Sequence, residues 1–338
     1  MPFAQLIGNQ RIKRAMQRAV VEDRIAQSLL MAGSRGVGKY QFAVALAQAL
    51  NCENSIEGDA CGVCVSCLRI ERNEHADVRT ILREIKDPNF KKEPKSQFIR
   101  IDQMRLMSEQ AQFRPYEGRR RVFIIDEAEW LRLEAANSIL KTLEEPPSTT
   151  LIILITSKPY SLLETIRSRC QMLSFAPVGA VEIEEHLLTK KKMSAVEAKI
   201  RARLSQGSIG RAFEIDLDAY REVRERMLAI VETLCLNPGL ATLLNASEHL
   251  GRKLEKEDFE IHLDTLMVVL SDLFRLKLNA SADLLTNADI VERLKLVAGK
   301  MTRDQISTLV DRIEETLFGQ IRNINRQLAM DSMLMRPL

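Results

Sequence analysis

The chain has 338 residues, of which 46% are hydrophobic and 28% charged, a composition typical of folded globular proteins and not of disordered ones. It has 49 Lys and Arg and 46 Asp and Glu, which gives a net charge of +3. This charge is too small for a protein that binds nucleic acid by itself through a basic surface. The longest apolar stretches, such as Leu151 to Ile155, are too short to cross a bilayer, and the N-terminus has no secretory signal, so we expect a cytoplasmic protein without membrane contact.

The first half of the chain alternates short apolar runs with helical patterns. Buried strands are expected at Ser28–Ala32, Arg121–Ile125 and Leu151–Thr156. Helices are expected from Tyr40 to Leu50 and from Ala136 to Leu143, where apolar residues recur three or four positions apart. This alternation favours a parallel α/β sheet that helices cover on both faces.

The second half is helical in pattern. The polar segment Asp87–Ser96 is expected to be an exposed loop, and Pro177 with Gly179 marks the end of the α/β half. The last helix has the clearest apolar stripe, formed by Ile306, Val310, Ile313, Leu317, Ile321, Ile324 and Leu328. We therefore expect three domains: an α/β domain over residues 1–177, a small helical lid over 178–216 and a helical bundle over 217–338.

The segment from Gly33 to Tyr40 has the G-x-x-x-x-G-K pattern of a phosphate-binding loop. It follows an expected strand and precedes an expected helix, so the N–H groups around Gly33, Gly36 and Gly38 could close on phosphates that Lys39 also reaches. The alternative is a glycine-rich turn with an exposed lysine. Tyr40 replaces the Ser or Thr whose hydroxyl normally binds Mg²⁺, which predicts impaired metal-dependent hydrolysis.

Two acidic residues follow the strand Arg121–Ile125. Asp126 could join a Mg²⁺ shell and Glu127 could orient an attacking water, although an acidic turn at a strand end is the alternative. ATP and Mg²⁺ are therefore candidate ligands of a site that is only half intact.

Four of the six cysteines are clustered and have the spacing C-x₈-C-x₂-C-x₂-C, at Cys52, Cys61, Cys64 and Cys67. Four thiolates close a tetrahedral Zn²⁺ shell, so the sequence predicts one structural zinc ion per chain in a module over residues 52–67. The alternative is four unligated thiols. Cys170 and Cys235 are isolated and are expected to be buried apolar residues.

Taken in order, the phosphate loop, the cysteine cluster, IIDEAEWL (124–131), AANSILKTLEEPP (135–147) and TIRSRC (165–170) resemble bacterial clamp-loader AAA+ subunits. The delta-prime type is the most similar, through NEHADV (73–78), IRIDQMRLM (99–107) and LLETIRSRC (162–170). The resemblance implies an AAA+ P-loop domain with a parallel sheet, followed by a small helical lid and an all-α collar domain.

Individual roles are implied by position in the family's motifs. Arg169 corresponds to the arginine finger that reaches the ATP of a neighbouring subunit, Thr156 to the sensor-1 residue and Arg211 to the sensor-2 residue of the lid. Ile7-Gly8 resembles the segment that lies against adenine. From the residues alone, each of three positions has an ordinary alternative. Arg169 could be a surface arginine in a salt bridge, Thr156 a threonine at a strand end, and Arg211 a basic residue at a helix start.

The function that the resemblance implies is that of a non-motor stator. Such a subunit assembles with tau/gamma motor subunits and a delta subunit in a heteropentamer of DNA polymerase III, which loads the sliding clamp on primed DNA, and its own ATPase activity is absent or weak. Two alternatives stay open. One is an ATP-hydrolysing motor of the tau/gamma type, which Lys39 and Asp126 favour and Tyr40 opposes. The other is a zinc-containing P-loop protein unrelated to replication.

Overall fold

The computed structural model describes residues 1–83, 98–236, 240–321 and 325–336, and it divides into two compact units. The first consists of Met1–Lys192 with Ser205–Phe213, and the second of Met193–Leu204 with Glu214–Leu338. The expected domain boundaries at 177 and 216 stay a prediction. The expected loop Asp87–Ser96 lies outside the described residues.

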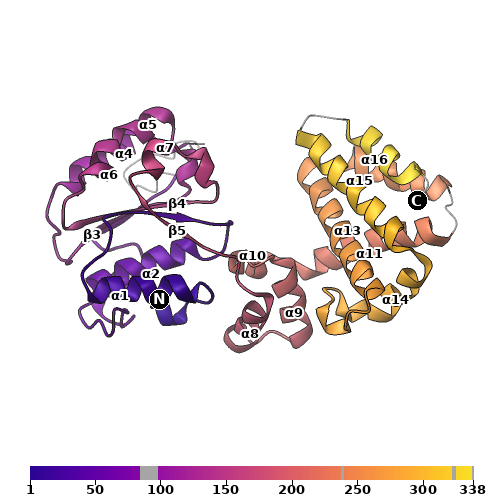
Figure 1. The fold of residues 1–338 in the computed structure, drawn as a ribbon, viewed down its shortest axis with the longest axis horizontal. Coiled ribbons are helices and arrows are strands. Elements are labelled where there is room, and N and C mark those ends of the chain that lie inside the picture. Colours follow the sequence, from indigo (N-terminus) through magenta and orange to yellow (C-terminus); the bar gives the residue numbers. More distant parts are fainter. Residues whose placement is uncertain (84–97, 237–239, 322–324, 337–338) are drawn as a thin grey trace. The chain divides into compact units, whose positions relative to one another are not determined.

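A parallel sheet of five strands forms the centre of the first unit (Figure 1). The strands lie in the order β2-β3-β4-β1-β5. Their bounds are Ser28–Ala32 for β1, Val78–Ile81 for β2, Arg121–Ile125 for β3, Thr150–Thr156 for β4 and Gln171–Ser174 for β5. The predicted parallel sheet is confirmed, and the three predicted strands are β1, β3 and β4. The two edge strands were not predicted, because each has only four residues and little apolar patterning.

Helices cover both faces of this sheet (Figure 1). One face carries α1 (Gln10–Val21) and α2 (Lys39–Asn51). The other carries α4 (Ile101–Ala111), α5 (Leu133–Ser138), α6 (Leu140–Glu144) and α7 (Glu164–Arg167). The predicted helix from Ala136 to Leu143 is divided between α5 and α6 at Ile139.

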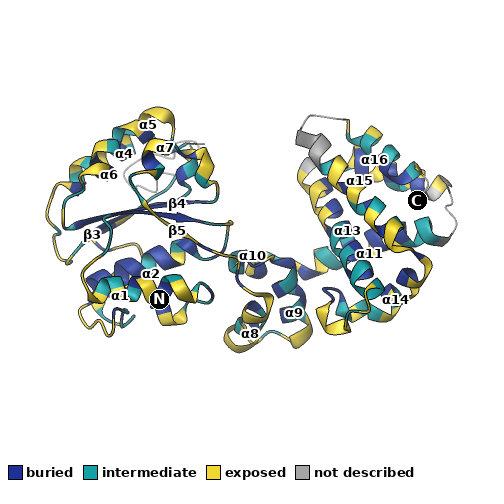
Figure 2. Ribbon diagram, in the orientation of Figure 1, coloured by how far each residue is buried: buried dark blue, intermediate teal, exposed yellow. Residues whose placement is uncertain are grey.

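Successive residues of a strand point to opposite faces, and β4 shows how both faces become buried. Ile153 and Ile155 pack in the cluster that contains Met16 of α1 and Leu46 of α2. Ile152 and Leu154 pack in the cluster of the α4–α6 face. A strand that is buried on both sides is mostly apolar: between Thr150 and Thr156 at its two ends, β4 has five successive aliphatic residues, and Figure 2 shows this strand as buried.

The remaining helices of the first unit are α3 (Val65–Glu71), α8 (Ala180–Lys191) and most of α10 (Ile209–Glu214). The second unit is helical. It contains α9 (Ala195–Leu204), α11 (Leu217–Leu236), α12 (Leu240–Glu248), α13 (Lys256–Lys277), α14 (Val291–Lys300), α15 (Arg303–Ile321) and α16 (Arg326–Met335). Within the described residues, no helix is both long and apolar enough to cross a membrane.

The prediction of one continuous last helix was wrong. The stripe is divided between α15 and α16, and Asn325 begins the second helix by accepting hydrogen bonds from the N–H groups of Gln327 and Leu328 at 2.9 and 3.3 Å. Asparagine is a strong N-cap residue, which explains a new helix start at this point. Leu328 is 66% exposed, and Ile324 lies outside the described residues.

A buried carboxylate fixes the loop that precedes β3. Asp77 accepts hydrogen bonds from the N–H groups of Tyr116, Glu117 and Gly118 at 2.7, 2.8 and 2.9 Å, and from the Arg121 guanidinium at 3.0 Å. Burial by itself would raise the pKa of Asp77, but these donors outweigh it and hold the pKa below its usual value. The NEHADV segment therefore has a structural role in this chain.

We predict that Asp77→Asn lowers the free energy of unfolding of the first unit by about 2–4 kcal/mol, because buried donors lose a charged acceptor. A depressed folded-state pKa stabilises the fold above the unfolded pKa of about 3.9, and this contribution is lost as the pH falls through the folded pKa. The difference between wild type and variant should therefore shrink below about pH 3.9. This difference in the free energy of unfolding can be measured by urea unfolding, monitored through the fluorescence of Trp130, the single tryptophan. Glu109→Gln, at an exposed position, is the control; equal unfolding midpoints for Asp77→Asn and wild type at pH 7 would contradict the prediction.

Candidate functional site

The candidate site lies where three parallel strands end at one edge of the sheet. Ala32 of β1 pairs with Thr156 of β4, and Ile125 of β3 pairs with Leu154 of β4. The residues that follow β1 and β3 must therefore lie close to Thr156. In this way the sheet brings together the phosphate loop, Asp126 and Thr156.

The phosphate loop has the backbone that its glycines predict. Gly36 and Gly38 have φ values of 77° and 94°, in the left-handed region that residues with a side chain rarely adopt. A Cβ added at Gly36 would lie 2.2 Å from Ser208 Oγ. The N–H of Gly210 donates to the Gly36 carbonyl at 3.0 Å. The loop is thus packed against the start of α10.

Lys39, the first residue of α2, is only 6% exposed. Its Nζ donates to the carbonyl oxygens of Gly33 and Ser34, both at 2.7 Å. Burial lowers the pKa of Lys39, and the nearby carboxylates of Asp126 and Glu129 act in the opposite direction. The ammonium therefore lies within the curve of the loop, where it could turn to a phosphate oxygen.

The Tyr40 hydroxyl lies at the neighbouring β2 strand, 3.3 Å from Thr80 Oγ1. The Tyr40 ring packs against the hydrophobic cluster between the sheet and α2. Both contacts hold the hydroxyl away from the position of a short serine or threonine hydroxyl, and impaired metal-dependent hydrolysis stays a prediction.

The acidic pair after β3 has two different environments. Asp126 Oδ1 accepts the N–H of Glu127 at 2.9 Å, and burial raises the pKa of Asp126. Glu127 has a left-handed backbone (φ 53°), and its carboxylate pairs with the Arg83 guanidinium at 2.6 Å. Arg83 in turn lies over the ring of Trp130, 4.7 Å from its centroid. The carboxylate predicted to orient a water is thus held by an arginine.

Sequence reasoning missed one acidic residue of this site. Glu129 Oε1 accepts hydrogen bonds from Ser157 Oγ at 2.6 Å and Ser157 N at 3.3 Å. Burial would raise the pKa of Glu129, but hydrogen bonds from the Ser157 hydroxyl, from the Glu129 backbone and from the Thr156 side chain together outweigh it and lower the pKa. The charge of Glu129 acts on both Lys39 and Asp126. The position of Glu129, two residues after Asp126-Glu127, could have indicated it. Its hydrogen-bond partner Ser157 could not, because Ser157 is distant in sequence.

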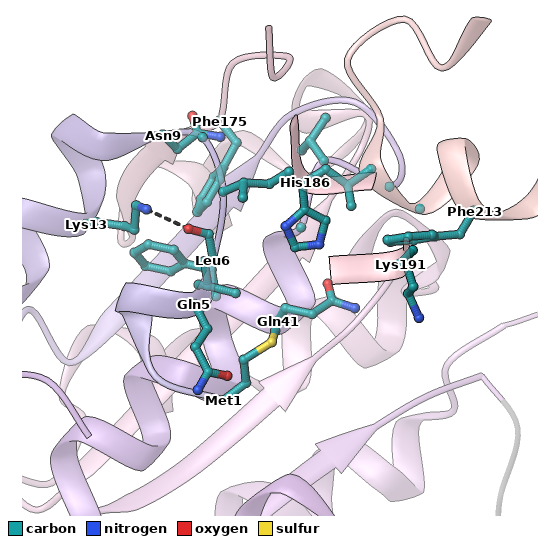
Figure 3. Close-up of a pocket in the computed structure, with 18 residues that line it drawn as sticks. Met1, Gln5, Leu6, Asn9, Lys13, Gln41, Phe175, His186, Lys191 and Phe213 are labelled. Carbon is teal, nitrogen blue, oxygen red and sulfur yellow. Dashed lines mark hydrogen bonds between the residues drawn. The ribbon is translucent and has the colours of Figure 1, made fainter. Parts of the chain in front are cut away.

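A pocket of about 370 Å³ adjoins the phosphate loop (Figure 3). It is bounded by the N-terminal segment, which contains a short 3-10 helix at Phe3–Gln5, and by the phosphate loop, the start of α2, the end of β5 and the helices α8 and α10. Its lining includes Leu6, Ile7, Gly8, Gly36, Gln41, Phe42, Phe175, His186 and Phe213. Figure 3 shows Leu6, Gln41 and His186 gathered around it.

Aromatic rings form much of the pocket wall. Phe42 and Phe175 lie edge to face with centroids 5.1 Å apart, and His186 meets Phe213 in the same way at 6.2 Å. Burial, together with two nearby lysines, lowers the pKa of His186, which favours a neutral ring. A planar base between apolar walls, with its phosphates on the adjoining loop, would match this chemistry. Ile7 and Gly8, predicted to lie against adenine, are part of the lining.

The two predicted arginines do not line this pocket. Arg169 donates through Nε and Nη2 to Glu144 Oε2 at 3.2 and 3.1 Å, and through Nη1 to the Thr165 carbonyl at 3.1 Å. Its side chain is 31% exposed and that of Glu144 is 59% exposed, so the pair lies at the surface. Arg211 is exposed, and its N–H donates to Ser208 Oγ at 3.1 Å.

The four clustered cysteines converge as predicted. Their Sγ atoms all lie within 4.8 Å of one another, and a tetrahedral zinc–thiolate shell has sulfur–sulfur edges of about 3.8 Å. Backbone N–H groups of Cys61, Cys64 and Cys67 donate to Sγ of Cys52, Cys61 and Cys64 at 3.3, 3.3 and 3.5 Å. The N–H of Val63 is the main cause that lowers the pKa of the Cys61 thiol to about 7. This donor set is compatible with a structural zinc site.

Known proteins match most of the chain. Residues 8–179 match the family described as DNA polymerase III, delta subunit, and residues 241–337 match the C-terminal family of the delta subunit. DNA polymerase III subunit delta' of Bacillus subtilis is 27% identical over 96% of this chain and 94% of its own length. DNA polymerase III subunit tau of Escherichia coli is 31% identical over 63% of this chain, but the match covers only 32% of that protein. A DNA polymerase III gamma subunit-related protein from Thermotoga maritima aligns over 95% of this chain and 96% of its own, at 18% identity and a TM-score of 0.41.

The family matches span the phosphate loop, the cysteine cluster, the acidic pair and the turn that carries Arg169, and they continue into the C-terminal helices. The chain therefore belongs to the DNA polymerase III delta subunit family.

Proposed function

We propose that this chain is the delta-prime-type stator of a bacterial clamp loader. In this role it assembles with tau/gamma motor subunits and a delta subunit, and the complex loads the sliding clamp on primed DNA in the cytoplasm. The observation that carries the proposal is the extent of the likeness: it covers 96% of this chain for subunit delta' but 63% for subunit tau. The net charge of +3 is consistent with a subunit that shares its DNA contacts with others.

The pocket and the phosphate loop are proposed to bind an adenine nucleotide without efficient hydrolysis. The buried ammonium of Lys39 and the aromatic walls supply what binding requires. Hydrolysis also requires a metal-binding hydroxyl and a free acidic group, whereas Tyr40 contacts Thr80 and Glu127 pairs with Arg83. These contacts are a second reason, besides the extent of the likeness, to favour the stator over the motor alternative.

Arg169 is proposed to act in a neighbouring subunit rather than in its own. It does not line the pocket of this chain, and within the described residues its ion pair is with one oxygen of the exposed Glu144. Exposed ion pairs of this kind contribute about 0–1 kcal/mol, so the guanidinium can change partners at little cost. A cation presented to the phosphates of a neighbouring ATP would stabilise the transition state of hydrolysis.

We predict that Arg169→Ala lowers ATP turnover of the assembled loader by about tenfold or more, because an arginine finger contributes orders of magnitude in rate. Assembly, measured by size-exclusion chromatography, should be unchanged. Arg167→Ala is the matched control. Arg167 precedes Arg169 by two residues, and its guanidinium lies over the ring of Tyr160. Wild-type turnover in the Arg169→Ala complex would exclude the finger role.

The cysteine module is proposed to hold one zinc ion through Cys52, Cys61, Cys64 and Cys67. Four thiolates leave no open position for a substrate, so zinc would contribute to folding rather than to a reaction. Burial raises the pKa of Cys52 and Cys67, so that without a cation these two thiols would stay protonated.

Metal analysis of protein purified without chelator should find about one zinc ion per chain. Cys64→Ser should lose the ion and lower the melting temperature, because one of four ligands is removed. Cys235→Ser, outside the module, should retain the full zinc content. A folded wild-type protein that contains no metal would rule out the zinc site.

A further inference from the structure

The cysteine module and the nucleotide pocket share one structural element, the N-terminal segment of residues 1–8. Leu6, Ile7 and Gly8 line the pocket, and the residues before them contact the module. The module itself contributes no side chain to the pocket lining. Any effect of the module on the pocket must therefore pass through this segment, through α1 or through α2.

Asp59 is the side chain that joins the module to the N-terminal segment. Its Oδ1 accepts the N–H of Phe3 at 2.8 Å, and its Oδ2 accepts the N–H of Ala4 at 3.0 Å. Oδ1 also accepts the N–H of Ala60 at 2.8 Å. Hydrogen bonds to a carboxylate are roughly twice as strong as neutral ones, so this side chain can fix the direction of the segment.

The fold of the module holds Asp59 in place. Its N–H and C=O exchange hydrogen bonds with Ile56 at 2.9 and 3.1 Å, and Ser55 Oγ donates to the Asp59 carbonyl at 3.1 Å. Gly58, with a φ of 76°, allows the turn to approach α1, since a Cβ there would lie 2.2 Å from the Gln17 carbonyl oxygen. Asp59 is thus set by the chain between the first and second cysteines of the cluster.

Two further contacts support the same connection. A Cβ on Gly62 would lie 3.1 Å from the Pro2 ring, so the glycine lets Pro2 pack closely on the module. Gln48 of α2 is fully buried; it donates to the Cys67 carbonyl at 2.7 Å and accepts from Met1 N at 2.7 Å. The segment is therefore held at three separate points along residues 1–4.

The held residues continue directly into the pocket wall. Phe3 is completely buried with its ring 4.9 Å from Phe42, which lines the pocket and contacts Phe175. Lys13 Nζ then donates to the Leu6 carbonyl at 2.8 Å, as Figure 3 shows. Release of Phe3 and Ala4 would therefore disturb both the aromatic wall and the position of Leu6.

We propose that Asp59 is a positioning residue through which the cysteine module holds the N-terminal segment as a wall of the nucleotide pocket. The base-binding side of the pocket then depends on the order of the module, whereas the phosphate loop does not. The inference rests on the proposed function in that it takes the ligand of the pocket to be an adenine nucleotide.

Asp59→Ala in the full chain tests this, with Glu53→Ala as the matched control, since Glu53 is an exposed acidic residue of the same module. Hydrogen exchange should accelerate by about tenfold in residues 1–8 of Asp59→Ala alone, because two backbone donors lose their acceptor. Asp59→Asn keeps one acceptor oxygen and should give an intermediate rate. Zinc content, measured in parallel, should stay at the wild-type level because Asp59 is not a ligand.

Binding of ATP and of inorganic triphosphate distinguishes positioning from general damage. Triphosphate lacks the base and the ribose, so in the proposed site it would contact the phosphate loop and not the N-terminal segment. Asp59→Ala should therefore weaken ATP binding by about three- to tenfold and leave triphosphate binding unchanged. Equal losses for both ligands, unchanged ATP binding, or unchanged exchange in residues 1–8 would each overturn the inference.

If wild type binds no ATP, the proposed nucleotide site is wrong, and the exchange of residues 1–8 then decides alone whether Asp59 holds the segment. Faster hydrogen exchange of residues 1–8 in Asp59→Ala would support the inference that Asp59 holds the segment. An exchange rate equal to that of wild type would overturn it.

Discussion

The parallel pairing of β1 with β4 and of β4 with β3 is the constraint on which the candidate site depends. Parallel strands end at one edge of a sheet, so this pairing alone brings the loop after Ala32, the carboxylate of Asp126 and the Thr156 position together. The strands can pair in this way only because helices bury both faces of the sheet. We propose that this edge of the sheet keeps nucleotide binding, through Lys39 and the pocket, whereas the contacts of Tyr40 and Glu127 oppose hydrolysis.

The features that could be predicted from the sequence are those that local patterns encode. The central strands contain continuous apolar runs, because a strand buried on both faces has few polar positions. The phosphate loop is visible because left-handed backbone requires glycine at positions 36 and 38. The cysteine cluster is visible because two-residue spacings bring neighbouring thiols together. The resemblance to a family added Arg169 and Ile7-Gly8, which carry little signal by themselves.

The features that could not be predicted depend on partners far apart in the chain. Tyr40 contacts Thr80, Glu127 pairs with Arg83 and Glu129 accepts from Ser157; each pair is set by the sheet and not by local sequence. The edge strands β2 and β5 gave no signal because a strand at an edge needs fewer apolar residues. The break between α15 and α16 was missed because an apolar stripe can continue across a helix cap. In each case the side-chain partner or the element boundary is determined by tertiary contacts, and the local sequence pattern does not specify it.

We propose that this chain binds ATP at its phosphate loop and pocket but hydrolyses it poorly. The decisive measurement is ATP binding and ATP turnover by the purified chain, with Lys39→Ala as the control. We expect that wild type binds ATP, that Lys39→Ala binds it more weakly, and that neither protein turns it over appreciably. Steady turnover by wild type that disappears in Lys39→Ala would instead identify a working motor site.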